Sequence, residues 1–211
     1  MERLGCVGEV FAAVTTGDQL NIDLLDQYRV RYVQVPNFPV SAKFNAALEL
    51  AGVADRYMVL PSDDFISTEW AGFAKEAGAA IEYIAADRCA LVDVISGRAK
   101  VLVNRPTGTM SFGAGRIFSR AVVDALGGQV WSNDRNAGLD TDSHGRIVGA
   151  GFECVVHPCE KVPICDLKTG ENIWAYSVWK GKDIPMSEAL HMLMAEQAQC
   201  LSSLYAPPRH S

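Results

Sequence analysis

The stretch "YMVLPSDDF" (57–65) ends an apolar run with a hydroxyl group and two adjacent carboxylates, Ser62, Asp63 and Asp64. Residues 56–60, "RYMVL", predict a buried strand that runs up to these polar side chains. Two neighbouring carboxylates repel each other, and burying them without a partner is costly. We therefore expect a positive partner next to Asp63 and Asp64, and a metal ion is the first candidate.

Strand-like and helix-like segments alternate through the first half of the chain. The sequence predicts strands over 9–16, 30–35 and 56–60, and helices over 21–28, over 41–51 and from 68 onward. Such alternation is typical of a parallel sheet with helices on its faces. Ligands bind these sheets at the carboxyl ends of the strands, so we expect Asp63 and Asp64 at the ligand-binding edge.

The predicted helices have side chains that can cap them. Asp18 or Asn21 can cap the first helix, Ser41 the second and Ser67 the third. Gly52 follows the second helix at the position where a glycine often ends one.

The second half of the chain predicts a different architecture. Residues 89–104 read as an antiparallel hairpin around the turn Ser96-Gly97, and a helix is expected over 119–126. A polar, loop-rich stretch follows over 129–151, and then a strand over 152–157. An amphipathic helix is expected over 185–205, with Leu190, Leu193, Met194, Leu201 and Leu204 on its core-facing side. We expect one α/β domain over 1–211.

The composition limits the class of protein. The chain has 211 residues, 49% of them apolar, which is enough for one domain with its own core. A formal net charge of −6 argues against a protein that holds nucleic acid by bulk electrostatics. The sequence predicts no membrane span and no signal peptide. Its six cysteines are sparse and irregularly spaced, so we expect a cytoplasmic location.

One group of residues raises the alternative of a small zinc protein. Cys154, His157, Cys159 and Cys165 are four possible zinc ligands, but their spacing fits no standard zinc ribbon or finger. The favoured interpretation is a strand whose cysteines are small apolar side chains that face the core of the protein.

Four segments together resemble a known family. In chain order they are "VPNFPVSAKFNAALELAGVADRYMVLPSDDFIS", "GAGRIFSR", "AGLDTD" and "DLKTGENIW". They resemble inverting family-2-type glycosyltransferases with the GT-A fold, in particular short bacterial and phage-encoded members, and the resemblance covers about 9–179. It implies a Rossmann-like, mostly parallel sheet, with a nucleotide- and metal-binding half (1–86) and an acceptor half (87–180) before the helix at 185–205.

The resemblance assigns the carboxylates a metal. In the family the corresponding carboxylates form a DxD element, of which Ser62-Asp63-Asp64 is a variant. Asp64 would coordinate Mg²⁺ or Mn²⁺, and Asp63 would bind the ribose or assist the metal. A hard divalent cation prefers carboxylate oxygens and shares the oxygens of a diphosphate. The resemblance also implies His157 as a further metal ligand, for which a strand-end histidine with a structural role is the alternative.

Further site residues are implied by the same resemblance. Asp140 would be the general base that takes the proton of the acceptor hydroxyl, with Asp142 as its nearby competitor. Lys43 and Asn45 would face the nucleotide near the start of their helix, although a solvated lysine and a helix-capping asparagine are the alternatives. Arg116 would reach a phosphate, or else form a surface ion pair.

The resemblance implies a nucleotide diphosphate-sugar donor and an acceptor hydroxyl on a glycan, a protein or a modified nucleic acid. It fails at the first strand of the family, which lines the base and ribose pocket and which we do not find before 9–16. Either the chain is a truncated version of the family, or the gene lost this unit, or a partner or a second copy of the chain completes the sheet edge. Two other functions stay open: a catalytically degenerate binding or assembly subunit, and a nucleotidyltransferase of related fold.

Overall fold

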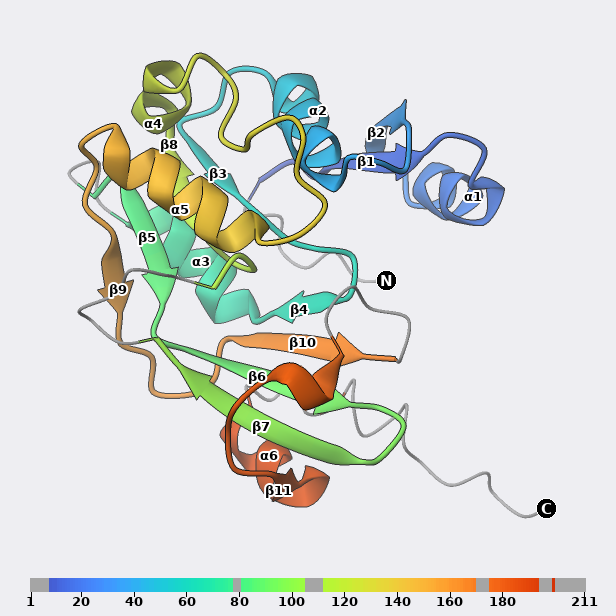
Figure 1. The fold of residues 1–211 in the computed structure, drawn as a ribbon, viewed down its shortest axis with the longest axis vertical. Coiled ribbons are helices and arrows are strands. Elements are labelled where there is room, and N and C mark those ends of the chain that lie inside the picture. Colours follow the sequence, from blue (N-terminus) through green and yellow to red (C-terminus); the bar gives the residue numbers. More distant parts are fainter. Residues whose placement is uncertain (1–7, 78–80, 105–111, 170–174, 194–198, 200–211) are drawn as a thin grey trace.

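The computed structural model describes residues 8–77, 81–104, 112–169, 175–193 and 199, and it has an α/β fold (Figure 1). The first elements are β1 (Phe11–Thr15), α1 (Gln19–Gln27), β2 (Arg31–Val35), α2 (Val40–Ala51), β3 (Arg56–Met58), β4 (Asp64–Ile66) and α3 (Thr68–Glu76). The middle elements are β5 (Tyr83–Ala86), β6 (Arg88–Asp93), β7 (Arg98–Val103), β8 (Ile117–Ser119), α4 (Arg120–Ala125) and α5 (Leu139–Gly149). The last are β9 (Val155–His157), β10 (Ile164–Lys168), the 3-10 helix η1 (Tyr176–Val178), β11 (Ile184–Pro185) and α6 (Met186–Met192).

The strands form three sheets, of which the two larger ones contain both parallel and antiparallel pairs. Their orders are β1-β2, β11-β7-β6-β10-β4 and β3-β8-β5-β9. Among the described strands three pairs are parallel (β1–β2, β5–β9 and β6–β10), and the other five are antiparallel. The α/β class is therefore confirmed, but the expectation of a mostly parallel sheet is not, because antiparallel pairs predominate.

The sequence had indicated that the two adjacent carboxylates, Asp63 and Asp64, end a parallel strand. The structure shows otherwise. β3 stops at Met58 and pairs antiparallel with β8. After Pro61 the chain turns, with the Asp64 amide donating to the Pro61 carbonyl at 3.2 Å. Asp64 then begins β4, which pairs antiparallel with β10. The carboxylates therefore lie where the chain passes from one sheet to another.

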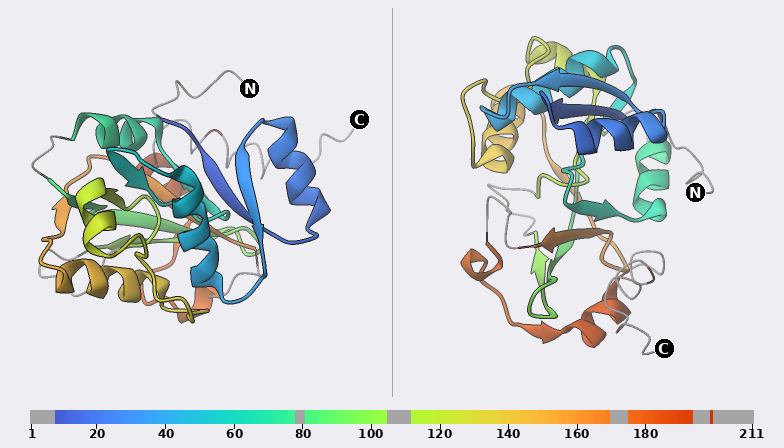
Figure 2. Two further views of the ribbon diagram at one scale, coloured as in Figure 1. Left: turned by 90° about the horizontal axis from the view of Figure 1, so that it is seen from above. Right: turned by 90° about the vertical axis from the view of Figure 1, so that its right-hand side faces the viewer.

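The first two strands form a sheet of their own. In the described part of the chain β1 pairs only with β2, and β3 pairs only with β8. Helix α2 packs against both β1 and β2, and its Leu48 belongs to the hydrophobic cluster that includes Tyr57 of β3. Figure 2 shows β1, β2 and α1 set to one side of the β3 sheet. Helix α2 is therefore the bridge between the small sheet and the rest.

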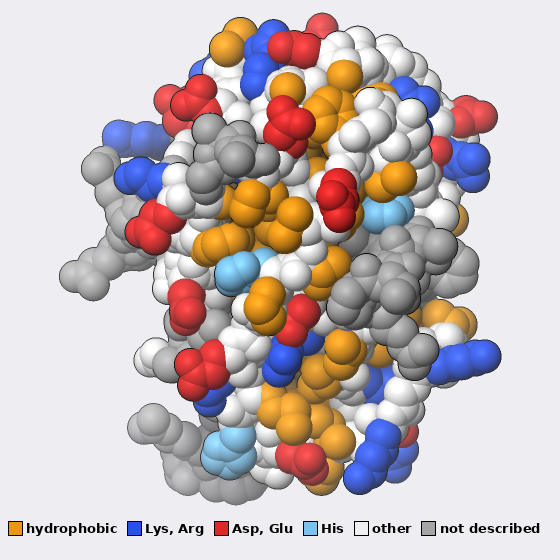
Figure 3. Space-filling view, turned by 90° about the vertical axis from the view of Figure 1, so that its left-hand side faces the viewer, with side chains coloured by type: hydrophobic (Ala, Val, Ile, Leu, Met, Phe, Trp, Pro, Cys, Tyr) orange, Lys and Arg blue, Asp and Glu red, His pale blue; other side chains and the backbone are white. Residues whose placement is uncertain are grey.

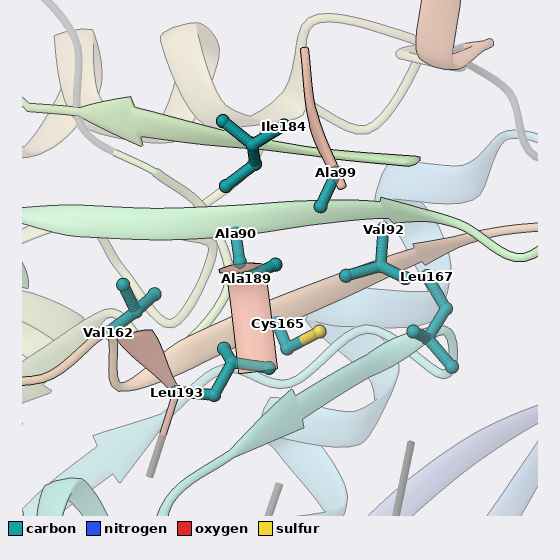
Figure 4. Close-up of a cluster of buried hydrophobic side chains, with 9 residues drawn as sticks. All are labelled: Ala90, Val92, Ala99, Val162, Cys165, Leu167, Ile184, Ala189 and Leu193. Atoms are coloured by element: carbon teal, nitrogen blue, oxygen red, sulfur yellow. The ribbon is translucent and has the colours of Figure 1, made fainter. Parts of the chain in front are cut away.

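Three hydrophobic clusters stabilise the fold. One packs beneath the β6–β7–β10 strands and includes Val92, Cys165 and Leu167 (Figure 4). A second lies under α2, α4 and α5. The third, around Trp70, takes Ile84 and Ile117 from one large sheet and Ile164 from the other. The third cluster therefore joins the two large sheets.

Much of the local structure follows the sequence signals. The side chains of Asp18, Ser67 and Ser119 cap α1, α3 and α4, and α2 ends at Gly52, whose φ is +66°. The hairpin of β6 and β7 is confirmed, including Gly97 at positive φ in its turn. Ser41 is not a cap; it lies inside α2 and its hydroxyl accepts a hydrogen bond from the Arg135 amide at 3.0 Å.

Several elements were missed, and one is described only in part. Helix α5 occupies much of the stretch predicted as a loop, and the strands β4, β5, β8, β10 and β11 were not predicted. The C-terminal helix is seen as α6, which carries Leu190 against the core but ends at Met192. Leu193 was expected inside the helix but is extended, and it packs on the core next to Val162 through a parallel β-bridge. Met194, Leu201 and Leu204 lie outside the described residues. In the described part of the chain, no helix combines the length and the apolar character that crossing a membrane requires.

Candidate active site

The strands β4, β10 and β6 carry their buried charged side chains on one face of the sheet, next to apolar residues such as Leu91, while a hydrophobic cluster covers the other face. In β10, Cys165 and Leu167 point to one face, where they join the cluster of Figure 4. Asp166 and Lys168 alternate with them and point to the other face. Asp64 lies directly opposite Asp166 across the antiparallel pair. Opposed side chains in such a pair have Cβ atoms about 4.5–5.5 Å apart, so the two carboxylates are neighbours.

Each of these two carboxylates has a buried oxygen whose hydrogen bonding is unsatisfied. The Oδ1 atoms of Asp64 and Asp166 are buried and have no hydrogen-bond partner among the described residues. Lys168 binds the other oxygen of Asp166, with Nζ 2.8 Å from Oδ2, and this lysine is itself buried. Buried carboxylate oxygens normally have partners, so this pair is an exception that needs an explanation.

The burial of this group shifts its protonation. Burial raises the pKa of Asp64 to about 9, and the carboxylates of Asp166 and Asp63 act in the same direction. Burial also raises the pKa of Asp166, although the ion pair with Lys168 opposes that rise. One ammonium group therefore faces at least two carboxylates, and the site has an excess of negative charge when they ionise. Carboxylates whose pKa is shifted this strongly are frequent at functional sites.

Asp140 joins the same site from a different element. It lies in the first turn of α5, which begins after Gly138 at a φ of +67°. Its charge acts on both Asp64 and Asp166. The Asp140 carboxylate rests against Gly113, where an added Cβ would lie 1.9 Å from Oδ1. The absence of a side chain at Gly113 therefore makes room for the Asp140 carboxylate.

Arg116 holds the first turn of α5 in place. Its guanidinium is buried, with 1% of the residue exposed, and donates from Nη2 to the Asp140 carbonyl at 3.1 Å and from Nη1 to Ser143 Oγ. It also lies over the ring of Tyr83. These contacts give Arg116 a structural role beneath Asp140, and a role at a phosphate stays a prediction.

Asp142, the alternative base, is engaged elsewhere. It accepts hydrogen bonds from the amide and the hydroxyl of Ser132, both at 2.7 Å, and Arg135 Nε lies 3.7 Å away. A carboxylate with these partners fixes the loop before α5. Of the two candidates, Asp140 is the one whose charge raises the pKa of both Asp64 and Asp166. We refer to the four neighbouring aspartates as the Asp64 group: Asp63, Asp64, Asp140 and Asp166.

The two α2 residues predicted to face a nucleotide have different surroundings. Lys43 Nζ donates to Thr15 Oγ1 at 2.7 Å and to Asn37 Oδ1 at 2.8 Å, at the carboxyl ends of β1 and β2. Burial lowers the pKa of Lys43. Asn45 is buried and exchanges hydrogen bonds with the backbone of Trp131. Lys43 is therefore placed at a sheet edge suited to ligands, while Asn45 fastens a loop to α2.

His157 lies in an aromatic cluster and not among the groups that act on Asp64. Its ring stacks on Phe73 with centroids 4.0 Å apart and tilts against Trp70 at 6.0 Å. It lines a cavity of about 390 Å³ with residues of α3 and of the 158–163 stretch, and the lining includes none of the four aspartates of the Asp64 group. Figure 3 looks at the side on which β9 lies, where hydrophobic side chains gather. A metal-binding role for His157 stays a prediction.

The four candidate zinc ligands are not gathered. Cys154, Cys159 and Cys165 pack on three different hydrophobic clusters, and Cys159 Sγ donates to the His157 carbonyl. This distribution agrees with small apolar cysteines facing the core and not with a zinc site.

The carboxylate group fits a hard divalent cation that shares its coordination with a ligand. Within the described residues, no three His, Cys, Asp or Glu side chains converge closely enough to hold a metal by themselves. Mg²⁺ is commonly held by one or two carboxylates together with substrate phosphates. The carboxylates of Asp64 and Asp166 suit this coordination, because each has an Oδ1 atom with no hydrogen-bond partner among the described residues.

The sequence signals found part of this site. They identified Asp63, Asp64 and Asp140, but they missed Asp166 and Lys168. The alternation of apolar and charged residues in "ICDLK" was the available signal, since it is typical of a strand with one polar face. Comparison with known proteins adds nothing to this assignment, because no family model and no curated protein matches the chain.

Proposed function

We propose that the protein is a metal-dependent glycosyltransferase that moves a sugar from a nucleotide diphosphate-sugar to an acceptor hydroxyl with inversion. The observation that supports it best is the half-buried carboxylate of Asp64, whose buried Oδ1 has no hydrogen-bond partner among the described residues and which lies beside Asp166 and near Asp140. The resemblance to family-2-type enzymes supplies the class of reaction.

Asp64 would hold the cation, and Asp63 would assist it or bind the ribose. When bound, Mg²⁺ or Mn²⁺ would neutralise the charge that develops on the leaving nucleoside diphosphate. Asp64 suits this task because burial raises its pKa to about 9, so the ionised form needs a cation beside it.

Asp140 would be the general base. It comes from α5, whereas Asp64 and Asp166 come from the sheet, so it approaches the reacting groups from another direction. It would accept the proton of the acceptor hydroxyl as that oxygen forms a bond to the anomeric carbon. The bond from this carbon to the diphosphate oxygen breaks on the opposite face, and a single displacement inverts the configuration.

Lys43 would mark the other end of the donor site. Its ammonium group, Thr15 and Asn37 form a polar group at the carboxyl ends of β1 and β2. This end of a parallel strand pair is where nucleotides bind in α/β sheets. The donor would therefore extend from the Lys43 group to the Asp64 group.

A second candidate function is a non-catalytic binding or assembly subunit. The observation that favours it is the separation of β1 and β2 from the β3 sheet in the described part of the chain. A nucleotide pocket built on two unconnected sheets would be incomplete unless a partner or a second copy filled the edge.

The two candidates are separated by variants assayed for release of nucleoside diphosphate from a panel of nucleotide-sugars with Mn²⁺. We expect Asp64→Ala and Asp140→Ala each to abolish release, while only Asp64→Ala weakens metal-dependent nucleotide binding. Full activity of Asp140→Ala would move the base elsewhere. Nucleotide binding with no release by the wild type would favour the binding subunit.

A further inference from the structure

We propose that Asp166 supplies a second carboxylate ligand to the same cation as Asp64, with Lys168 as the residue that positions it. This inference rests on the proposed function, since it concerns the metal of that site. Asp166 was not among the residues that the sequence indicated.

The sheet register brings the two carboxylates together. Asp64 and Asp166 are directly opposed residues of β4 and β10, so both side chains leave the same face of the sheet. The backbone fixes this register beyond the strand pair, because the Leu167 amide donates to the Asp63 carbonyl at 3.0 Å. The pairing is therefore a property of the backbone and does not depend on one rotamer.

The ion pair with Lys168 leaves one oxygen of Asp166 for a ligand. Nζ of Lys168 engages Oδ2 at 2.8 Å, while Oδ1 is buried and, like Oδ1 of Asp64, has no hydrogen-bond partner in the part of the chain that the structure describes. A partner that holds one oxygen of a ligating carboxylate orients the other, which is the usual task of groups behind metal ligands. Lys168 is 6% exposed and lies two residues along β10, on the same face as Asp166.

A divalent cation satisfies this arrangement better than a hydrogen bond does. Two ionised carboxylates are acceptors only, so neither can satisfy the other. A cation between the two Oδ1 atoms would satisfy both and offset their repulsion. Two protein carboxylates with diphosphate oxygens and water complete the coordination that Mg²⁺ prefers, and no third protein ligand is needed.

The test uses Mn²⁺ alone with the full chain, followed by the loss of the free-Mn²⁺ signal in electron paramagnetic resonance. We expect Asp64→Asn and Asp166→Asn each to weaken Mn²⁺ binding by about tenfold or more. Asp93→Asn is the matched control, because Asp93 lies on the same sheet face opposite Lys168 and loses the same charge. It should stay within about twofold of the wild type.

The outcomes separate this inference from the proposed function. One outcome is that Asp166→Asn binds Mn²⁺ as tightly as the wild type, while Asp64→Asn binds it more weakly. Asp166 is then not a ligand, and the proposed function is unaffected. If the wild type binds no Mn²⁺, with or without nucleoside diphosphates, both fail together. Should Asp166→Asn fold poorly, Asp166→Cys replaces it, and its preference for Zn²⁺ over Mn²⁺ should rise about tenfold, because thiolates favour softer metals. An unchanged preference would overturn the assignment.

Discussion

The two faces of the β4–β10–β6 sheet are built from the same strands but have opposite properties. On one face Ala90, Val92, Cys165 and Leu167 pack in a hydrophobic cluster. On the other face the alternating residues include Asp64 and Asp166, each with a buried oxygen that has no partner among the described residues. The first face contributes stability through apolar burial alone, whereas the second combines buried apolar residues such as Ile164 and Leu91 with unsatisfied carboxylate oxygens that lower stability.

This difference is the reason for placing the proposed site on the charged face. Unsatisfied polar groups concentrate at functional sites. Changes on the apolar face should destabilise the fold and leave the chemistry intact in the remaining folded protein. Changes on the charged face should do the reverse.

The largest expected change in stability is for Leu167→Ala, on the apolar face. Leu167 lies between Asp166 and Lys168 in sequence and packs in the cluster on the other side. Loss of its side chain should lower the free energy of unfolding by about 2–4 kcal/mol, measured by urea denaturation. The affinity for Mn²⁺ should not change in the folded protein. A loss below about 1 kcal/mol would mean that this face is not a tight core.

A smaller effect, with the opposite sign, is expected for Asp64→Asn. Burial raises the pKa of folded Asp64 to about 9, from 3.8 for an unperturbed aspartate. The folded state thus keeps a proton that the unfolded chain releases, so the wild type should lose stability as the pH rises from about 4 towards 9. The Asn variant should lack this loss.

Urea denaturation at several pH values measures this effect without added metal. Near pH 8 the Asn variant should be more stable than the wild type by at least about 1 kcal/mol, and near pH 4 the two should agree. A variant that is less stable than the wild type at pH 8 would show that Asp64 ionises with a partner in the folded protein.

The smallest expected change in stability is for Gly113→Ala, at the edge of the charged face. The new methyl group would meet the Asp140 carboxylate, which can rotate away because it is the end of a side chain. Stability should change by less than about 1 kcal/mol. Release of nucleoside diphosphate should fall by about 10²–10⁴, the usual contribution of a general base, with Mn²⁺ binding unchanged. An active Gly113→Ala enzyme would argue against Asp140 as the base.

The sequence predicted local structure well, but it predicted the pairing of strands that are distant along the chain poorly. The cap of α3 and the β6–β7 hairpin depend on neighbouring residues, so Ser67 and Gly97 were predicted correctly. Ser41 was predicted wrongly, because its hydroxyl binds the distant Arg135 amide. Strand direction depends on which segments meet in space. The apolar run that includes Tyr57 is compatible with either direction, and its antiparallel partner, β8, lies far along the chain.

The missed elements have physical reasons of their own. Helix α5 begins after Gly138, contains two further glycines, Gly145 and Gly149, and is polar over 140–144, so its helix propensity is low. Its buried side chains, Ser143, His144 and Ile147, decide the outcome through tertiary contacts, such as the 2.9 Å hydrogen bond between His144 Nδ1 and Tyr83. Asp166 was missed because its importance comes from its register with Asp64, which the sequence alone does not state.

The most direct test of a metal-diphosphate role for the charged face is a thermal-shift measurement of the wild-type protein. Nucleoside diphosphates would be added singly, each with and without Mn²⁺. We expect one of them to raise the melting temperature only when Mn²⁺ is present, because the cation must bridge Asp64 and the diphosphate. If no nucleoside diphosphate has an effect in either condition, the carboxylates do not hold a metal-diphosphate, and the proposed transferase function is wrong.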